Sequence, residues 1–95
     1  MEVHFNDVFY KNNIIDIRSS LDFYEENIIG SINVPRIILL SNPSMYLNQY
    51  DDYYLVCDKG KVSLSCCKVL NALGYKCYSI IGGIESVDDI YKNKV

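Results

Sequence analysis

The chain has 95 residues, of which 49% are hydrophobic and 22% charged, and its formal net charge is −3. This length suits one small domain with a single core. The apolar fraction is too high for a disordered chain, because it provides enough buried surface to offset the loss of chain entropy. We therefore expect one globular domain over residues 1–95.

Charge and hydropathy argue against a nucleic-acid or membrane partner. No apolar stretch approaches the ~20 residues that span a bilayer, and Met1–Phe5 lacks the basic start and apolar core of a signal peptide. The lysines are scattered and stand mostly near acids, so no basic stripe for a phosphate backbone is expected. We expect a soluble, cytoplasmic protein.

The cysteines do not have the spacing of a disulfide framework or a zinc site. Cys66 and Cys67 are adjacent on an expected helix and Cys77 lies in an expected strand, so we interpret all three as buried free thiols. Zinc ligands usually come in C-x-x-C or H-x-x-H pairs, and His4, the only histidine, is far from the cysteines in sequence. We expect no metal and no cofactor.

Strand and helix signals alternate along the chain. Ser19 and Asp22 form the S-x-x-D pattern of a capping box, and Pro35 suits the first position of a helix. The expected elements, in chain order, are a helical turn at 7–10, a strand at 13–17, a helix at 20–26, a strand at 32–34, a helix at 35–40, a turn at 43–48, a strand at 53–56, a helix at 61–73, a strand at 77–81 and a helix at 84–92. This alternation favours a parallel α/β sheet with right-handed crossovers.

The most informative segment is the loop that follows the apolar run Tyr53–Val56. This run has the pattern of a parallel strand buried on both faces, and it ends at Cys57, after which a polar glycine loop leads into the helix at 61–73. Ligands bind beyond the carboxyl ends of the strands in such sheets. Cys57 is therefore our candidate nucleophile, and the alternative is a buried structural cysteine followed by a surface turn.

The loop offers an electropositive setting rather than a general base. Its amide N–H groups, the dipole of the following helix, Lys59 and Lys61 favour a thiolate or a bound anion, whereas Asp58 opposes them. No histidine lies nearby in sequence, which argues against a protease-like Cys/His pair. Gly60 has two compatible interpretations: it is an ordinary turn glycine, and it lets the chain curl closely round the sulfur.

Three further polar residues are candidate supports of this loop. Asp16 and Arg18 follow the strand expected beside the Cys57 strand and suit a charge-assisted hydrogen-bonded pair. We favour a scaffold role for this pair over direct catalysis. Ser63 either caps the helix or donates a hydrogen bond to the sulfur, and we favour the cap.

Five segments, in order along the chain, resemble the motifs of one known family. They are Asp16-Ile17-Arg18 (D-x-R), Asp22-Phe23 (E-[FY]), Asn27 to Pro35 (H-I-P-G-A-I-N-V-P, with the His falling on Asn27), Cys57 to Ser63 (C-R-x-G-x-R-[ST]), and Gly74-Tyr75 with Gly82-Gly83-Ile84 (L-x-x-x-G-[YF] and G-G). Over most of its length the chain thus resembles a single-domain rhodanese, a thiosulfate sulfurtransferase-type module.

The resemblance implies a fold and an activity. The fold would be a five-stranded parallel sheet flanked by helices on both faces. Cys57 would accept a sulfane sulfur from thiosulfate or a persulfide donor, hold it as a persulfide among the loop amides, and pass it to a thiol, a thioredoxin-like acceptor or another nucleophile. The implied substrate-binding residues are Asp58, Lys59, Gly60, Lys61, Val62 and Ser63.

Two positions depart from the family's loop. Its arginines fall on Asp58 and Val62, so thiosulfate, a dianion, is expected to bind less well than in a typical member. The missing arginine also argues against the related cysteine-dependent phosphatases and arsenate reductases, which are a distant alternative. The nearer alternative is a catalytically weak or inactive binding or regulatory module, although such modules often lack the cysteine.

Overall fold

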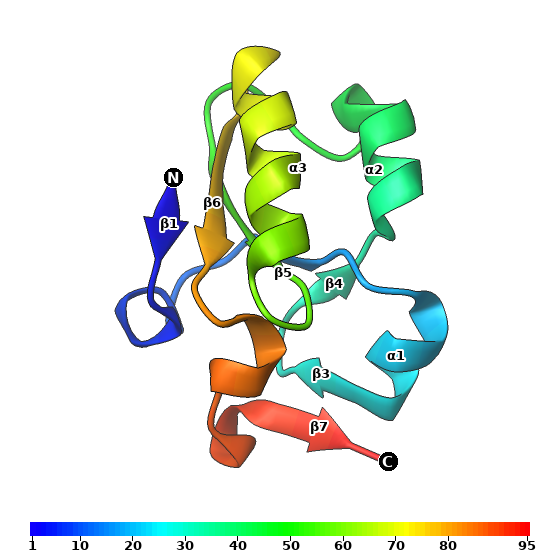
Figure 1. The fold of residues 1–95 in the computed structure, drawn as a ribbon, viewed down its shortest axis with the longest axis vertical. Helices are drawn as coiled ribbons and strands as arrows, with labels where there is room; N and C mark the ends of the chain where they lie inside the picture. Colours follow the sequence, from blue (N-terminus) through cyan, green and yellow to red (C-terminus); the bar gives the residue numbers. More distant parts are fainter.

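The fold is built around a five-stranded sheet (Figure 1), and the computed structural model describes all 95 residues, Met1–Val95. In spatial order the strands are β1 (Glu2–Val3), β6 (Lys76–Ile80), β5 (Asp52–Val56), β2 (Ile14–Asp16) and β4 (Ile32–Asn33). Every neighbouring pair in this sheet is parallel. The parallel α/β architecture expected from the sequence is confirmed.

Helices and a second, two-stranded sheet connect and cover these strands. The α-helices are α1 (Ser20–Glu25), α2 (Arg36–Ser41) and α3 (Lys61–Ala72). The 3-10 helices are η1 (Phe5–Asp7), η2 (Pro43–Met45), η3 (Gly83–Ser86) and η4 (Asp89–Tyr91), and the small sheet pairs β3 (Glu26–Ile28) with β7 (Lys92–Lys94). None of the helices is both long and apolar enough to cross a membrane.

The two faces of the main sheet carry separate apolar clusters. On one face, α2 and α3 lie side by side (Figure 1), and Leu39 and Leu70 from these helices pack with Leu55 of β5, all three fully buried. On the other face, Phe5 of η1 and Ile84 of η3 pack against the sheet. Helices therefore lie on both faces, as expected, but those on the second face are short 3-10 turns.

The C-terminal segment differs from the sequence prediction. Residues 84–92 were expected to form a helix, and this prediction is wrong: the segment forms η3 and η4 and then enters β7, which pairs antiparallel with β3. Two glycines with positive φ, Gly82 and Gly83, begin the segment. Contacts with β3, formed by residues about two-thirds of the chain away, outweigh the weak helix propensity of a short stretch.

Most other elements lie where the sequence predicts them. The expected strand and helix around Cys57 correspond to β5 and α3, whereas the expected turn at 7–10 is η1, a few residues earlier. Ser19 caps α1, since its Oγ accepts a hydrogen bond from the Asp22 N–H at 3.2 Å. Pro35 precedes α2 as its N-cap instead of occupying its first position.

The register of the sheet brings two loops together at one edge. Asp16 of β2 lies directly opposite Val56 of β5, and the Ile17 N–H donates to the Val56 carbonyl at 3.0 Å. Because the two strands are parallel and end level with each other, the residues that follow them emerge side by side. The loop that carries Cys57 therefore lies against the one that carries Arg18.

Candidate active site

The sulfur of Cys57 is held by the backbone of its own loop. The N–H groups of Gly60 and Ser63 each donate to Cys57 Sγ at 3.2 Å, and the thiol donates to Ser63 Oγ, also at 3.2 Å. Cys57 is 3% exposed and lies at the N-terminal end of α3. Two inward-pointing N–H donors at a helix start stabilise negative charge on the sulfur.

Gly60 is required by the shape of this loop. It is the N-cap of α3 and has φ +99°, a left-handed conformation that side chains rarely adopt. A Cβ at this position would lie 2.9 Å from the backbone nitrogen of Gly82. Of the two interpretations of Gly60 offered by the sequence, the structure therefore supports the one in which the chain curls closely round the sulfur.

The segment after β6 holds the other side of the loop. The Ile84 N–H donates to the Cys57 carbonyl at 2.8 Å, and the Glu85 N–H donates to the Asp58 carbonyl at 3.3 Å. Gly83 allows this approach, because a Cβ on it would overlap both of these carbonyl oxygens. The glycine pair that the sequence analysis singled out is thus a structural support of the cysteine loop.

Two buried hydroxyl groups lie beneath the sulfur. Ser63 Oγ and Ser79 Oγ are 2.6 Å apart, and Ser79 Oγ also donates to the Gly60 carbonyl at 3.2 Å. Both serines are fully buried. The sequence-based preference for Ser63 as a helix cap is wrong: α3 has no side-chain cap, and the hydroxyl contacts the sulfur instead.

Ser79 was not identified by the sequence analysis. The available signal was a small polar residue in the middle of the apolar strand β6, a position at which burial is expected. Such a residue needs a hydrogen-bond partner inside the protein. Its partners, Ser63 and Gly60, lie 16 and 19 residues away in sequence, so that signal alone could not connect it with Cys57.

Asp16 and Arg18 form the charge-assisted pair that the sequence suggested. Arg18 donates to both carboxylate oxygens of Asp16, with Nη2 2.8 Å from Oδ2, and its backbone N–H donates to Oδ1 at 3.0 Å. Burial disfavours the charge of Arg18, but the contacts with Asp16 outweigh this and raise its pKa. The Glu26 carbonyl accepts a further bond from Arg18 and fixes its orientation.

A cavity of about 370 Å³ opens above the sulfur. It is lined by Ile17, Arg18, Ser19, Asp22, Cys57, Asp58, Lys59, Lys61 and Val62. Its charges are mixed: Asp58 is 66% exposed in its side chain and lies 3.9 Å from Arg18, whereas Lys59 and Lys61 make no ion pair. Of the candidate site residues, Asp16, Gly60 and Ser63 do not line this cavity.

The other three cysteines are free and buried, as expected. Burial raises the pKa of Cys66 and, more strongly, that of Cys67, and it raises the pKa of Cys77 to about 12. These thiols therefore stay protonated near neutral pH. No three histidine, cysteine or acidic side chains converge in a way that could hold a metal ion.

The structure places a cysteine among backbone amides at the carboxyl edge of a five-stranded parallel sheet. The resemblance of the five sequence segments to the rhodanese motifs implies the same arrangement. The model of the rhodanese-like domain family matches residues 4–89 of this chain. The match covers most of the chain, so the protein belongs to the rhodanese-like domain family.

Several solved structures have a similar fold. SSP1007 from Staphylococcus saprophyticus has a TM-score of 0.86 and 22% identity over 98% of this chain and 99% of its own. A rhodanese-related protein from Thermoplasma volcanium has a TM-score of 0.80 and 23% identity over 90% and 87%. A rhodanese with anions from E. coli has a TM-score of 0.73 and 22% identity over 88% and 99%. No curated protein matches the sequence.

Proposed function

We propose that this protein is a sulfurtransferase in which Cys57 carries a sulfane sulfur as a persulfide. The observation that carries the proposal is the setting of Cys57, which lines an open cavity and whose sulfur accepts hydrogen bonds from two backbone N–H groups. Fixed donors of this kind stabilise an anionic sulfur without reorganising during the reaction. Membership of the rhodanese-like family makes this chemistry the first one to test.

The reaction has two steps that balance without a cofactor. In the first, the Cys57 thiolate attacks the sulfane sulfur of the donor, a new S–S bond forms, and the donor's own bond to that sulfur breaks. The electron pair of the broken bond leaves with sulfite, or with a thiolate if the donor is a persulfide. In the second step, an acceptor thiolate attacks the outer sulfur, and the electron pair of the Cys57 persulfide bond returns to Cys57.

The charges in the cavity favour a persulfide over thiosulfate as the donor. Arg18 is engaged by the Asp16 carboxylate and lies near Asp58, so little of its positive charge is free for a dianion. Lys59 and Lys61 remain as unpaired cations at the rim. We propose that these loop residues bind the donor, and that a small thiol or a thioredoxin-like protein takes the sulfur.

Intact-mass measurement tests this function directly. After incubation with thiosulfate, or with a small-molecule persulfide, wild-type protein should gain the mass of one sulfur atom, and a thiol acceptor should remove it. Cys57→Ser should gain nothing. Cys66→Ser is the matched control, because that thiol is buried and protonated, and this variant should load like the wild type.

The opposite result has a defined meaning. If neither donor loads the wild-type protein while its circular dichroism spectrum shows a folded α/β protein, the proposed activity is wrong. The chain would then be a binding or regulatory member of its family.

A further inference from the structure

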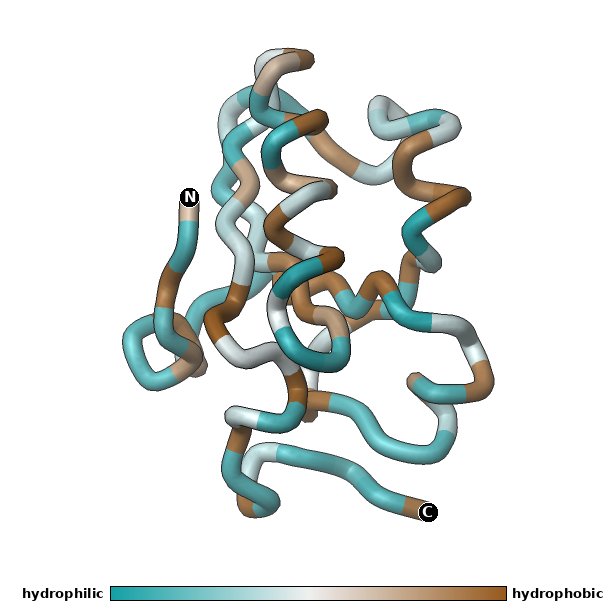
Figure 2. Tube along the Cα trace, in the orientation of Figure 1, coloured by the Kyte–Doolittle hydropathy of each residue, from teal (hydrophilic) through white to brown (hydrophobic).

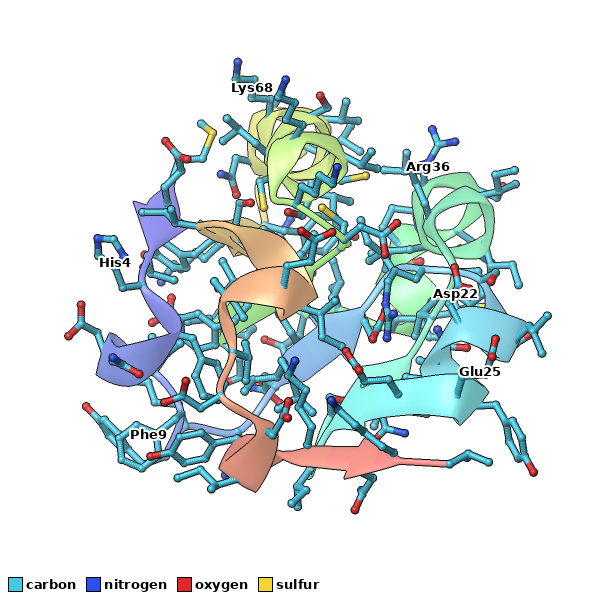
Figure 3. All side chains as sticks on the ribbon, turned by 60° about the horizontal axis from the view of Figure 1, so that its bottom comes forward. His4, Phe9, Asp22, Glu25, Arg36 and Lys68 are labelled. Carbon is cyan, nitrogen blue, oxygen red and sulfur yellow. The ribbon has the colours of Figure 1, made fainter.

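The face formed by α2 and α3 carries positive charge on a protein whose formal net charge is −3. Within residues 33–50 the only charged residue is Arg36, and residues 59–73 contain three lysines and no acid. Figure 3 shows Arg36 and Lys68 projecting from α2 and α3, on the same side of the sheet. Arg36, Lys61 and Lys68 make no ion pair. The lysines that look scattered in the sequence are thus partly gathered by the fold.

A hollow with an apolar floor lies between the two helices. It measures about 350 Å³ and is lined by Arg36, Leu40, Val62, Ser65, Cys66 and Val69. Apolar side chains around it are exposed, with Val69 at 49% and Ile37 at 71%, and Figure 2 shows the apolar stretch along α2. Because burial keeps the Cys66 thiol protonated, the floor of this hollow is uncharged. A surface of this kind favours apolar contact with a partner.

This hollow adjoins the cavity at Cys57. Val62 lines both of them. A third hollow joins them on the other side, since it is lined by Arg36 from the α2–α3 hollow and by Ile17 and Ser19 from the cavity. A partner seated between α2 and α3 would therefore lie beside the Cys57 cavity.

We propose that the α2–α3 surface, defined by Arg36, Ile37, Leu40, Val62, Ser65 and Val69, docks a partner protein that exchanges sulfur with Cys57. The proposal rests on the proposed function. The docking segment of the partner carries acidic and apolar side chains beside its reactive cysteine, because the surface supplies unpaired cations around an apolar floor. A small inorganic donor makes no use of such a surface.

The chemistry at this surface is the second step of the proposed reaction. The thiolate of the partner's cysteine attacks the outer sulfur of the Cys57 persulfide, the new S–S bond forms on the partner, and the electron pair of the broken bond returns to Cys57. Docking raises the local concentration of this thiol at the cavity without taking part in bond making.

Two synthetic peptides test the surface. Each carries one cysteine flanked by leucines at helical spacing; one has glutamates at the remaining positions and the other has lysines there. The rate of sulfur transfer from the Cys57 persulfide to each peptide is measured, with free cysteine as the small-thiol reference. The glutamate peptide should react at least ten times faster than the lysine peptide, and 1 M salt should remove most of this advantage.

Variants with matched controls test whether the preference for the glutamate peptide arises at the α2–α3 surface. Arg36→Glu and Val69→Asp should each slow transfer to the glutamate peptide by about tenfold, which corresponds to about 1.4 kcal/mol, and should leave transfer to free cysteine unchanged. Lys76→Glu and Ile90→Asp make the same changes of charge and polarity on exposed residues outside the surface. Both controls should behave like the wild type.

Four outcomes would overturn the proposal. Equal rates for the two peptides would do so, as would an effect of Lys76→Glu as large as that of Arg36→Glu. Tighter binding of a single-stranded oligonucleotide than of the glutamate peptide would assign the surface to a different partner. A concentration-dependent dimer that Arg36→Glu dissociates, seen by sedimentation, would assign it to a second copy of this chain.

If the proposed sulfurtransferase activity is absent, the docking surface can still be tested separately. In that case Cys57 never gains sulfur, and docking is measured with fluorescent peptides in which serine replaces the cysteine. Fluorescence anisotropy should still show tighter binding of the glutamate peptide, weakened by Arg36→Glu but not by Lys76→Glu. Equal anisotropy for both peptides would overturn the docking surface by itself.

Discussion

The environment of the Cys57 sulfur depends on a hydroxyl group that does not touch it. Ser63 Oγ contacts the sulfur and is itself 2.6 Å from Ser79 Oγ, which donates to the Gly60 carbonyl. Because Gly60 and Ser63 supply the two N–H donors to the sulfur, Ser79 fixes the position of both. Ser79 is therefore a positioning residue for the candidate nucleophile.

Ser79→Ala should slow the loading of sulfur onto Cys57 several-fold and lower the free energy of unfolding by about 1–2 kcal/mol, because Ser63 loses a buried partner. The reaction is followed by intact mass and the stability by urea unfolding. If Ser79 orients the thiolate, the pH profile of loading should also shift. A role in stability alone would leave that profile unchanged and would contradict the prediction. The control is Ser41→Ala, whose exposed hydroxyl lies outside both hollows and bonds only the Ile37 carbonyl.

At the scale of the elements, the loop between β5 and α3 takes its shape from the turn after β6. Gly83 has φ +61° and lies against the carbonyl groups of Cys57 and Asp58, where any side chain would overlap them. Gly30 is also left-handed, with φ +86°, but nothing lies within 4 Å of the position of its Cβ. Comparing alanine substitutions at these two glycines therefore separates the cost of a strained backbone from the cost of a clash with the cysteine loop.

Gly30→Ala should cost about 1–2 kcal/mol of stability, because only the left-handed conformation is strained. Gly83→Ala should cost about 1–3 kcal/mol more, since the added methyl group also pushes the cysteine loop out of place. Sulfur loading should fall sharply in Gly83→Ala and stay near the wild-type rate in Gly30→Ala. Urea unfolding gives the two free energies, and equal costs would mean that the turn does not support the loop.

At the scale of the whole molecule, folding buries three thiols that the proposed reaction does not use. The pKa of each is raised above its ordinary value of 9.0, chiefly by burial, and that of Cys77 reaches about 12. Above pH 9.0 the unfolded chain loses these protons while the folded chain keeps them. The unfolded state then binds fewer protons, so the free energy of unfolding falls as the pH rises from about 9 towards about 12.

Cys77→Ala should reduce this dependence on pH, although its stability at pH 7 falls because the substitution leaves a cavity. The measurement is urea unfolding of both proteins at several pH values between neutral and about 10.5, compared by slope. The free energy of unfolding of the wild type should fall more steeply with pH than that of Cys77→Ala. The difference between the two slopes should be at most about 1.4 kcal/mol for each pH unit, the contribution of one titrating thiol. Parallel slopes would show that Cys77 ionises equally in the folded and unfolded chain.

Local patterns in the sequence determined the cysteine loop and the strand and helix on either side of it. A run of apolar residues that ends at Cys57, a glycine after it and apolar residues at helical spacing were enough to predict β5, the loop and α3, because each signal lies within a few residues. Asp16 and Arg18 could be predicted as a pair for the same reason, since they stand two residues apart.

Only the tertiary structure decided which residues distant in sequence support and surround the cysteine loop. The hydroxyl pair of Ser63 and Ser79 joins residues 16 apart. β7, where local propensity wrongly indicated a helix, pairs with β3, whose residue Asn27 is 66 positions before its partner Asn93. Cations that are dispersed in sequence gather on one face when α2 packs beside α3. Pairing and packing between segments that are distant in sequence determine these features. A local sequence pattern does not show which distant residues will contact it.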